Sequence, residues 1–438
     1  MAHAAYTICI HGACLLAALP ALVRTIRIRG YGAWLLRRFG RLPDNLPAGQ
    51  PVWIHAVSVG EVKACRSLIH ALQEQCPQLP LVLSTGTPTG YDTARQLFPE
   101  LYVFGAPLDL PWVVKRVLRR VSPRLLILME LEAWPSLLRC VDAAGVPQVI
   151  LNGRVSHSSF EKYKKIGWWL PEFDRLDLVA TQDEVGAERM AELGVPGAHL
   201  HVTGNMKHDL IRSNAHGTAE SLGQSVGLAD GTPVFVAGST HDGEDGAVVR
   251  AWLEAGGGDV AHLVLVPRHL TRLKDIGRLL GKLHVPFVLR SEATPDRTAE
   301  QVLLVDTMGE LEKLFELADL VFLGGSLAPV GGHNVLEPAA AGCPVIVGPH
   351  IETCRREAEL LAAAGGLEVL SDEATFAAAV ARLLADASER QKMGHAARQA
   401  LLGLQGATEA NLDLLRSKGL LRGSALDHGG ECSTLSRP

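Results

Sequence analysis

Leu-Val-Phe-Leu at residues 320–323, followed by Gly-Gly-His-Asn-Val-Leu-Glu-Pro at 331–338, is the stretch that decides the fold class of this chain. The order predicts an apolar strand, a glycine turn and then a helix that begins in the small residues 339–342. Glycine lets backbone N–H groups approach a ligand closely, and a helix N-terminus favours a phosphate. Glu337 could then hold the hydroxyls of a ribose. Taken alone, the same residues also fit a plain tight turn capped by Asn334.

A second glycine turn, Ser-Val-Gly-Glu at 58–61, follows an apolar run in the other half of the chain. Between and beyond these turns, apolar runs alternate with helical stretches such as 111–121 and 183–193. Near-continuous apolar strands between helices indicate a parallel sheet covered on both faces. The predicted strands form two sets: 52–57, 81–84, 102–104, 125–129, 149–151 and 178–180, and then 234–237, 263–266, 302–305, 320–323 and 345–347.

The 438 residues therefore predict two doubly wound α/β domains that face each other. Ligands bind beyond the carboxyl ends of the strands in such sheets, so we expect one ligand on each side of a cleft. The expected division is an N-terminal anchor at 1–24, a first domain at 25–210, a linker at 211–232, a second domain at 233–405 and a tail at 406–438.

The N-terminal segment predicts attachment to a membrane. Residues 4–23 carry no formal charge, and six arginines follow before the first acidic residue, Asp44. About 20 residues of helix span a bilayer core, and excess positive charge stays on the cytoplasmic side. We expect an anchor here, spanning or interfacial, with the body in the cytoplasm. A buried core helix is the alternative, because His11 and Pro20 weaken the span.

Charged side chains leave the predicted strand ends of the first domain. Glu61 opens the helix after the first strand, where a helix N-terminus favours the ionised carboxylate of a proton acceptor. Glu130 and Glu132 follow the strand 125–129, and we expect one of them to act, with Glu130 nearer the strand. Lys207 could neutralise a leaving phosphate or a substrate carboxylate. Each of these residues is also compatible with an ordinary surface position.

The stretch 161–170 interleaves basic and aromatic residues. This mixture suits a membrane interface or a lipid phosphate. Single-stranded nucleic acid also binds such mixtures, but a net charge of −5 argues against a nucleic-acid partner. A solvated helix face with two core tryptophans is the alternative.

Strand ends of the second domain converge on the same sheet edge as 331–338. They are Gly-Ser-Thr-His at 238–241, Pro-Arg-His at 267–269 and Met-Gly-Glu at 308–310. The planar guanidinium of Arg268 matches phosphate oxygens. The chain has no G-x-x-x-x-G-K-[ST] motif and no clear metal-carboxylate cluster. We therefore expect protein cations and a helix dipole to act, with no metal and no cofactor.

The motif set resembles the 3-deoxy-D-manno-octulosonic acid (Kdo) transferases of Gram-negative lipopolysaccharide synthesis, over roughly residues 24–405. The matching elements are Ala-Val-Ser-Val-Gly-Glu at 56–61, Thr-Gly-Thr-Pro-Thr-Gly at 85–90, Leu-Asn-Gly-Arg at 151–154, Gly-Asn-Met-Lys at 204–207, Ala-Gly-Ser-Thr-His at 237–241, Pro-Arg-His at 267–269 and the stretch 331–338.

The resemblance implies the two-domain GT-B fold, no required metal and an N-terminal anchor in the inner membrane. It implies transfer of Kdo from CMP-Kdo to the lipid A precursor lipid IVA, with inversion. The chain reads Glu-Leu-Glu-Ala-Trp-Pro-Ser at 130–136, where the family usually has Glu-Thr-Glu-Leu-Trp-Pro-Asn. Both carboxylates are kept, but which of them acts stays open.

The resemblance also implies residue roles. Glu61 matches the general base, and Glu130 and Lys207 match positions that stabilise the transition state. The expected CMP contacts are Pro267, Arg268, His269, Met308, Gly309, Glu310, Asn334, Val335, Leu336 and Glu337. The acceptor-side candidates are Ser58, Gly60, Arg154, Lys162 and Lys165.

Rival interpretations use the same fold. A nucleotide-sugar epimerase would act on a soluble substrate and need no anchor, so residues 4–23 discriminate against it. Another GT-B lipid glycosyltransferase would bind UDP rather than CMP. A non-catalytic membrane scaffold would have lost its carboxylates, and this chain has kept them.

Overall fold

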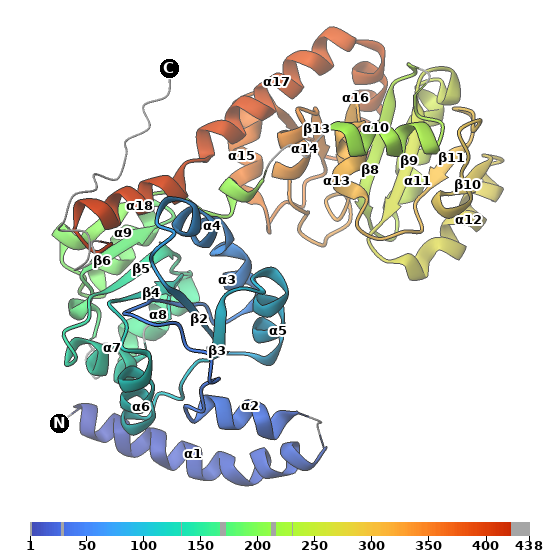
Figure 1. Ribbon diagram of the computed structural model, residues 1–438. Coiled ribbons are helices and arrows are strands. Elements are labelled where there is room, and N and C mark those ends of the chain that lie inside the picture. The colour runs from blue at the N-terminus through green and yellow to red at the C-terminus, as the bar shows by residue number, and fades with distance from the viewer. Residues whose placement is uncertain are drawn as a thin grey trace. The chain divides into compact units, whose positions relative to one another are not determined.

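The computed structural model describes residues 2–27, 30–132, 134–166, 172–211, 216–229 and 231–421. The chain divides into two compact units (Figure 1). Unit 1 comprises Met1–Leu210 and Gln405–Pro438, and unit 2 comprises Ile211–Leu404. Each unit is built on one parallel sheet with helices on both faces, which confirms the two predicted Rossmann-like domains.

The sheet of unit 1 has seven parallel strands in the order β3-β2-β1-β4-β5-β6-β7. The strands are β1 Val52–His55, β2 Leu81–Thr85, β3 Tyr102–Gly105, β4 Leu125–Met129, β5 Gln148–Gly153, β6 Leu178–Thr181 and β7 Leu200–Val202. The helices are α1 Ala2–Arg27, α2 Tyr31–Arg38, α3 Val59–Ala64, α4 Arg66–Gln75, α5 Pro88–Leu97, α6 Pro111–Val121, α7 Pro135–Asp142, α8 His157–Ile166, α9 Glu184–Glu192 and α18 Ala407–Ser417.

Alternate strand residues of unit 1 enter two separate cores. Val52 and Ile54 of β1 pack with α3, α4, α5 and α18, whereas Trp53 packs with α6 and α7 on the opposite face. Successive strand side chains point to opposite faces of a sheet, so an all-apolar strand needs helices on both. The strand order reverses between β1 and β4, which makes their carboxyl ends the switch point where ligands bind in such folds.

Helix starts in unit 1 follow ordinary capping chemistry. The Ser58 side chain caps α3, and Thr87 caps α5 ahead of Pro88 at the first helical turn. Asp109 caps α7 from a distance, because its carboxylate accepts hydrogen bonds from the backbone N–H groups of Ser136 and Leu137 at 2.9 and 2.8 Å. These caps fix the loops that follow β1, β2 and β3 at the ligand-binding edge.

The sheet of unit 2 also has seven parallel strands, in the order β10-β11-β9-β8-β12-β13-β14. They are β8 Val234–Thr240, β9 His262–Pro267, β10 Phe287–Leu289, β11 Val302–Leu304, β12 Leu320–Leu323, β13 Val345–Val347 and β14 Leu367–Val369. The helices are α10 His216–Ser225, α11 Glu244–Glu254, α12 Leu273–Lys282, α13 Leu311–Glu316, α14 Leu336–Ala341, α15 Arg355–Ala363, α16 Glu373–Ala385 and α17 Ala387–Leu404. The order reverses between β8 and β12, which is the switch point of this unit.

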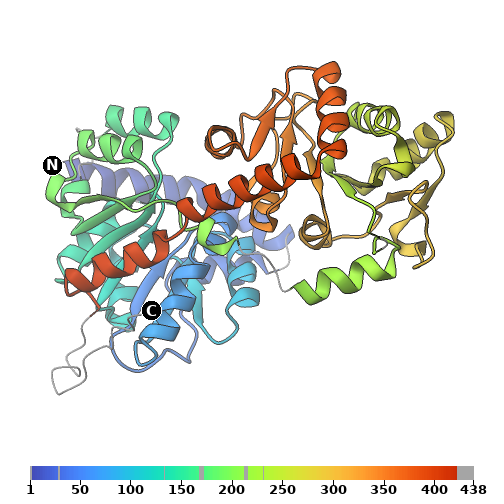
Figure 2. The same cartoon turned by 90° about the horizontal axis from the view of Figure 1, so that it is seen from above.

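The segments expected to be a linker and a tail both contain helices. Helix α10 lies within 211–232 and packs on α13 inside unit 2. Helix α18 returns to unit 1 and lies beside α4 (Figures 1 and 2), where Thr408 Oγ1 donates to Ser67 Oγ at 2.8 Å. Leu412 and Leu415 of α18 enter the core of unit 1. Helices α10 and α18 each have an apolar face that packs on a neighbouring element. The polar residues around these helices made both segments look like loops in the sequence.

The N-terminal segment forms α1, which lies against α2 (Figure 1). Within the residues that the structure describes, no helix combines the length and the apolar character needed to cross a membrane. The spanning anchor expected at residues 4–23 is therefore not supported, and several side chains of this segment lie outside the described residues. Tyr6 of α1 donates a hydrogen bond to Asp109 at 2.7 Å. The helix thus contacts the loop that caps α7.

Candidate active site

Glu61 lies at the switch point of unit 1, in the first turn of α3. Its buried carboxylate accepts hydrogen bonds from the backbone N–H of Val57 and from Ser58 Oγ, both at 2.7 Å. Burial raises the pKa of Glu61, the two hydrogen bonds oppose that shift, and the nearby Glu130 adds to it. The result is a fixed carboxylate with raised basicity, which suits a general base.

Glu130 leaves β4 beside Glu61 and is held by a left-handed backbone with φ of 57°. Its backbone N–H donates to the Leu151 carbonyl at 3.1 Å, which continues the pairing with β5. Lys207 Nζ donates to Glu130 Oε1 at 2.8 Å. A left-handed conformation is unfavourable for a residue with a side chain, and such strain concentrates at functional sites.

Asn152 explains why Lys207 reaches Glu130 from beyond the edge strand β7. Asn152 lies at the end of β5, also with a left-handed backbone, and its Oδ1 accepts a hydrogen bond from the backbone N–H of Met206 at 3.0 Å. Met206 itself is fully buried in the core. These two contacts hold the 203–207 segment across the strand ends, so the lysine is carried back to the switch point.

Glu132 is the third carboxylate of this cluster. Trp134 Nε1 donates to Glu132 Oε2 at 2.9 Å. Burial, the Glu61 carboxylate and the Glu130 carboxylate raise the pKa of Glu132 to about 7, against the effects of the Trp134 hydrogen bond and of Arg38. Glu132 therefore changes charge near neutral pH, next to the other two carboxylates.

Arg38 brings a partly buried positive charge to the same place. It ends α2, and its Nη1 donates to the Gly86 carbonyl at 2.5 Å. Burial lowers the pKa of Arg38, and the Glu132 carboxylate opposes that effect. Arg38 and His55 line a small cavity of about 30 Å³. Burial, and then the charge of Arg38, lower the pKa of His55 to about 3, so this imidazole is neutral.

The acceptor-side candidates of the sequence are spread over unit 1. Ser58 contacts Glu61 directly, whereas Gly60 is exposed in α3 and Arg154 is exposed after β5. Lys162 and Lys165 are exposed on α8. Tyr163 of the same helix has its pKa raised by burial and by the Glu132 carboxylate, so α8 borders the acidic cluster. The two tryptophans expected to complete this patch, at 168 and 169, lie outside the described residues.

In unit 2, Glu244 organises the loop that follows β12. Its nearly fully buried carboxylate accepts hydrogen bonds from five backbone N–H groups at 2.7 to 3.1 Å, namely those of His241, Gly325, Ser326, Leu327 and Ala328. Gly324 permits this approach, because a Cβ there would lie 2.5 Å from the Ser239 carbonyl oxygen. The carboxyl ends of β8 and β12 are thereby tied together at the switch point.

Three histidines meet above this loop. His241 Nε2 lies 3.0 Å from His333 Nε2, and the two rings are stacked with centroids 5.2 Å apart. His269 meets the His241 ring edge-on at 5.7 Å. Burial, together with the surrounding positive groups, lowers the pKa values of both His241 and His333. Arg268 is exposed beside them, at the end of β9.

The other residues expected to contact CMP differ in how accessible their side chains are to a ligand. Asn334 Nδ2 donates to Glu337 Oε1 at 2.9 Å, and burial raises the pKa of Glu337. Val335 and Leu336 are buried in the core, so only their backbone can meet a ligand. Met308 and Glu310 lie in the loop before α13. The Met308 side chain is 75% exposed, whereas the Glu310 carboxylate accepts a hydrogen bond from Arg290 Nη2 at 3.0 Å. Gly309 has φ of 82°, which suits the turn, and Pro267 ends β9.

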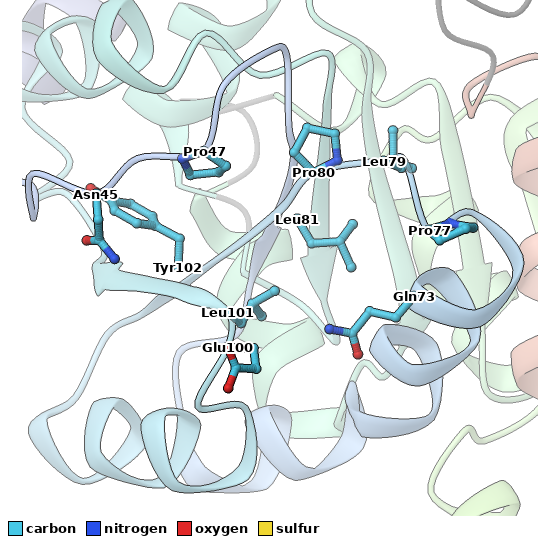
Figure 3. A pocket seen from close by; sticks show the side chains of 10 residues that line it. All are labelled: Asn45, Pro47, Gln73, Pro77, Leu79, Pro80, Leu81, Glu100, Leu101 and Tyr102. Carbon is cyan, nitrogen blue, oxygen red and sulfur yellow. The ribbon is translucent and has the colours of Figure 1, made fainter.

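A separate pocket of about 440 Å³ lies at the opposite edge of the unit 1 sheet, where the strands begin (Figure 3). Leu81 and Tyr102 at the starts of β2 and β3 line it, with Pro47, Pro77 and Pro80 around them (Figure 3). Ligands of such sheets bind at the carboxyl ends of the strands. We therefore place the candidate active site at the switch points and not in this pocket.

Among the residues that the structure describes, no group of three or more histidine, cysteine, aspartate or glutamate side chains is arranged to hold a metal ion. Metal-independent chemistry stays a prediction. Sequence reasoning missed Arg38, His55 and Glu244. The sequence could have indicated Glu244, because this carboxylate closely follows the predicted strand end Gly-Ser-Thr-His and begins α11. No feature of the local sequence indicated that the Arg38 side chain turns inward.

Comparison with solved structures defines the class of fold. UDP-GlcNAc 2-epimerase from Neisseria meningitidis superposes with a TM-score of 0.59 at 12% identity, over 84% of this chain and 100% of that chain. MurG from Acinetobacter baumannii superposes with a TM-score of 0.50 at 13% identity, over 84% and 100%. At these identities the likeness shows the fold alone, which is of the GT-B type.

Family models identify the class of enzyme. A model described as 3-deoxy-D-manno-octulosonic-acid transferase (kdotransferase) matches residues 34–210, and one described as glycosyl transferases group 1 matches residues 286–400. The chain is a glycosyltransferase. The 3-deoxy-D-manno-octulosonic acid transferase of Haemophilus influenzae is 36% identical over 392 residues, which cover 88% of this chain and 91% of the relative. The chain belongs to the Kdo transferase family, which confirms the resemblance read from the motifs.

Proposed function

We propose that this protein transfers Kdo from CMP-Kdo to lipid IVA, the lipid A precursor, with inversion at the anomeric carbon. The observation that carries the proposal is the convergence of Glu61, Glu130 and Lys207 at the switch point of unit 1. These residues follow three different strands, β1, β4 and β7, and meet where a ligand of this fold binds. The name of the Haemophilus influenzae relative supports Kdo as the transferred sugar.

Glu61 is the general base of the proposed mechanism. It takes the proton of the acceptor's primary hydroxyl as the oxygen attacks the anomeric carbon of Kdo. Ser58 and the Val57 N–H hold the carboxylate in one orientation, and burial raises its basicity. General base catalysis contributes about 10²–10⁴-fold in rate. Attack by the activated alcohol opposite to the departing CMP gives inversion in one displacement.

Lys207 and Glu130 act as a pair in the same step. The lysine ammonium stabilises negative charge that develops on the donor, and the Glu130 carboxylate orients the ammonium through the 2.8 Å contact. Kdo carries its own carboxylate, so its donor needs a cation near the sugar as well as near the phosphate. Glu130 makes this contact from a residue with a left-handed backbone.

Unit 2 supplies the donor site in this proposal. Arg268, exposed at the end of β9, pairs with the phosphate of CMP. Glu337, oriented by Asn334, accepts hydrogen bonds from the ribose hydroxyls. The backbone N–H of Leu336 donates to Asn334 Oδ1 at 3.2 Å, so in this proposal it is the backbone N–H of Val335 that donates to the nucleotide, while the side chains of both residues remain in the core.

We also propose that helix α1 contacts a membrane surface, where the lipid acceptor is found. Ile8, Leu16 and Ile26 of this helix are 72%, 83% and 78% exposed. Exposed large apolar side chains on one helix, followed by arginines, are typical of helices that lie at a bilayer interface. In this proposal α1 lies on the inner membrane, and the body of the protein lies on the cytoplasmic face of that membrane.

Glu61→Gln tests the central assignment, because it keeps the size of the side chain and removes the base. We expect transfer, measured by mass spectrometry of lipid IVA incubated with CMP-Kdo, to fall by 10² or more. CMP affinity and the melting temperature should stay at wild-type values. Glu74→Gln, at an exposed position of α4, is the matched control. Wild-type turnover of Glu61→Gln would remove Glu61 as the base, and a wild-type protein that leaves lipid IVA unmodified would overturn the proposed function.

A further inference from the structure

We propose that Arg38 and His55 form a subsite of the acceptor site, and that this subsite takes one oxygen of the acceptor's headgroup. The subsite deepens the proposed function and rests on it, because the acceptor is the lipid A precursor. The oxygen belongs either to a phosphate or to a hydroxyl of the headgroup. Both are oxygens with free lone pairs, and both accept hydrogen bonds from N–H groups in the same way.

The cavity that Arg38 and His55 line has room for a single oxygen atom. Its volume is about 30 Å³. One water needs about 10–15 Å³, whereas a whole phosphate group or a sugar ring needs far more. Trp134, whose side chain is 40% exposed, lines the same cavity, so the cavity borders the protein surface. A ligand oxygen can therefore enter while the rest of the headgroup stays outside.

His55 supplies the first hydrogen-bond donor of the cavity. Its side chain is 2% exposed, and its Nδ1 lies 2.7 Å from Ser84 Oγ. Trp53 Nε1 donates to the same Ser84 Oγ at 2.7 Å, which leaves His55 Nδ1 as the group that accepts the hydroxyl proton of Ser84. The ring proton of His55 consequently lies on Nε2. This N–H has no hydrogen-bond partner among the residues that the structure describes.

Arg38 supplies the second donor. Its Nη1 donates to the Gly86 carbonyl at 2.5 Å, which fixes the guanidinium against the loop after β2. Its buried Nε has no hydrogen-bond partner within the described part of the chain. Buried polar groups are nearly always paired in proteins. Two unpaired N–H donors on the wall of one cavity therefore indicate a ligand atom that accepts from both.

Asp109 also lines the cavity but pairs with neither donor. Its carboxylate already accepts hydrogen bonds from the backbone N–H groups of Ser136 and Leu137 and from the Tyr6 hydroxyl. An ionised carboxylate has about four acceptor sites, so it can accept one more hydrogen bond. A hydroxyl in the cavity accepts from the two N–H groups and can donate its own proton to Asp109, whereas an ionised phosphate oxygen only accepts.

Two residues of the cavity wall also hold the acidic cluster. The backbone N–H of Val57 donates to the Glu61 carboxylate at 2.7 Å, and Trp134 Nε1 donates to Glu132 at 2.9 Å. An acceptor oxygen in the cavity is therefore held beside the proposed general base. A second point of attachment limits the orientations of the headgroup and so keeps its reacting hydroxyl near Glu61.

Direct binding of lipid IVA to the full chain tests the subsite. The Kd is measured by thermophoresis with the lipid in nonionic detergent micelles. Arg38→Lys keeps the charge but has no N–H at the position of Nε, and His55→Leu removes the other donor. Each should raise the Kd of lipid IVA by about tenfold, while the KM for CMP-Kdo stays at the wild-type value. His55→Gln can place an amide N–H near the position of Nε2, and it should recover most of the affinity that His55→Leu loses.

Arg41→Lys and His70→Leu change exposed residues of the same types, and both controls should bind lipid IVA like the wild-type protein. Lipid IVA treated with alkaline phosphatase separates the two sources of the oxygen. With the treated lipid, equal Kd values for Arg38→Lys and wild type assign the oxygen to a phosphate. A tenfold difference that persists assigns it to a hydroxyl.

Wild-type affinity for lipid IVA in both Arg38→Lys and His55→Leu would overturn the subsite and leave only a buried water in the cavity. An equal rise in the KM for CMP-Kdo would also overturn it, because the substitutions would then act on the fold as a whole. Where His55→Leu shows no cooperative melting transition, Arg38→Lys decides the question. The proposed function fails separately, if the wild-type protein leaves lipid IVA unmodified.

Discussion

The ammonium of Lys207 contacts the carboxylate of Glu130 at 2.8 Å, although 77 residues separate them in the chain. Glu130 directly follows the central strand β4, and Lys207 follows the edge strand β7. The pair exists because Asn152 and the buried Met206 hold the intervening segment across the strand ends. The pair fixes a cation at the switch point where Glu61 also lies, which is the arrangement that a group transfer with a charged donor requires.

Removal of Lys207 should therefore slow catalysis more than it weakens the fold. Lys207→Ala takes away the cation that faces the developing negative charge, and losses of about 10²–10³ in kcat are expected for such a group. The side chain is 38% exposed, so its loss should leave the melting temperature nearly unchanged. Steady-state kinetics and thermal unfolding check both expectations. Lys164→Ala, which breaks an exposed pair with Glu192, is the control, and wild-type kcat in Lys207→Ala would contradict the role.

Backbone strain at Glu130 gives a test that separates the effect of this residue on stability from its effect on activity. With φ of 57°, alanine at this position keeps the strain and glycine removes it. Glu130→Gly should be about 1 kcal/mol more stable to unfolding than Glu130→Ala, while neither variant transfers Kdo at an appreciable rate.

The matched pair at Glu188, in the helix α9, should show the ordinary order, with glycine about 1 kcal/mol less stable than alanine. Denaturant unfolding followed by circular dichroism measures both pairs. The same order at the two positions would show that the strain at Glu130 is absent in solution.

Glu132 should set part of the pH dependence of activity. Its pKa is raised to about 7, in part by the nearby Glu61 carboxylate. Repulsion between two carboxylates acts on both, so a charged Glu132 also disfavours the charged form of Glu61. Glu132→Gln removes one negative charge from the surroundings of Glu61, which lowers the pKa of Glu61. The acidic limb of the kcat/KM profile should consequently move to lower pH.

The control for this shift is Glu188→Gln, because that exposed carboxylate lies on α9, outside the cluster. Its pH profile should overlay that of the wild-type protein. Disappearance of the acidic limb, or loss of activity at every pH, in Glu132→Gln would show that Glu132, and not Glu61, is the group whose ionisation limits the rate.

Much of the fold follows from the sequence because parallel strands put their carboxyl ends on one edge. Every predicted strand is present, and a residue that follows an apolar run directly, such as Glu130, or within a few positions, such as Glu61, is thereby placed at the ligand edge. The short edge strands β10 and β14 escaped notice, since three residues such as Phe287–Leu289 carry too little pattern. The helical segment that follows β1 is interrupted at Cys65, which separates α3 from α4.

Features that depend on distant partners could not be predicted in this way. Arg38 is one of the arginines that follow the uncharged N-terminal segment, a pattern that predicts contact with a membrane surface. In the structure its side chain turns inward and donates to the Gly86 carbonyl. The imidazoles of His241 and His333 are 92 residues apart in sequence, and their contact depends on the backbone of Gly325. Local pattern reports which side chains are polar, whereas tertiary structure decides which polar groups they meet.

Glu244 should prove the most sensitive position of unit 2, because one carboxylate satisfies five backbone N–H groups. Glu244→Gln replaces one acceptor oxygen by an NH₂ that faces N–H donors, and it removes the negative charge that strengthens all of these bonds. We expect a loss of about 2–4 kcal/mol in the free energy of unfolding and a large loss of CMP affinity. Denaturant unfolding and calorimetry measure the two quantities. Glu254→Gln, at the exposed C-terminal end of the same helix, should change neither. Wild-type denaturant midpoint and wild-type CMP affinity in Glu244→Gln would contradict this role. The loop after β12 would then be held by other contacts, and the Glu244 carboxylate would not be what ties β8 to β12.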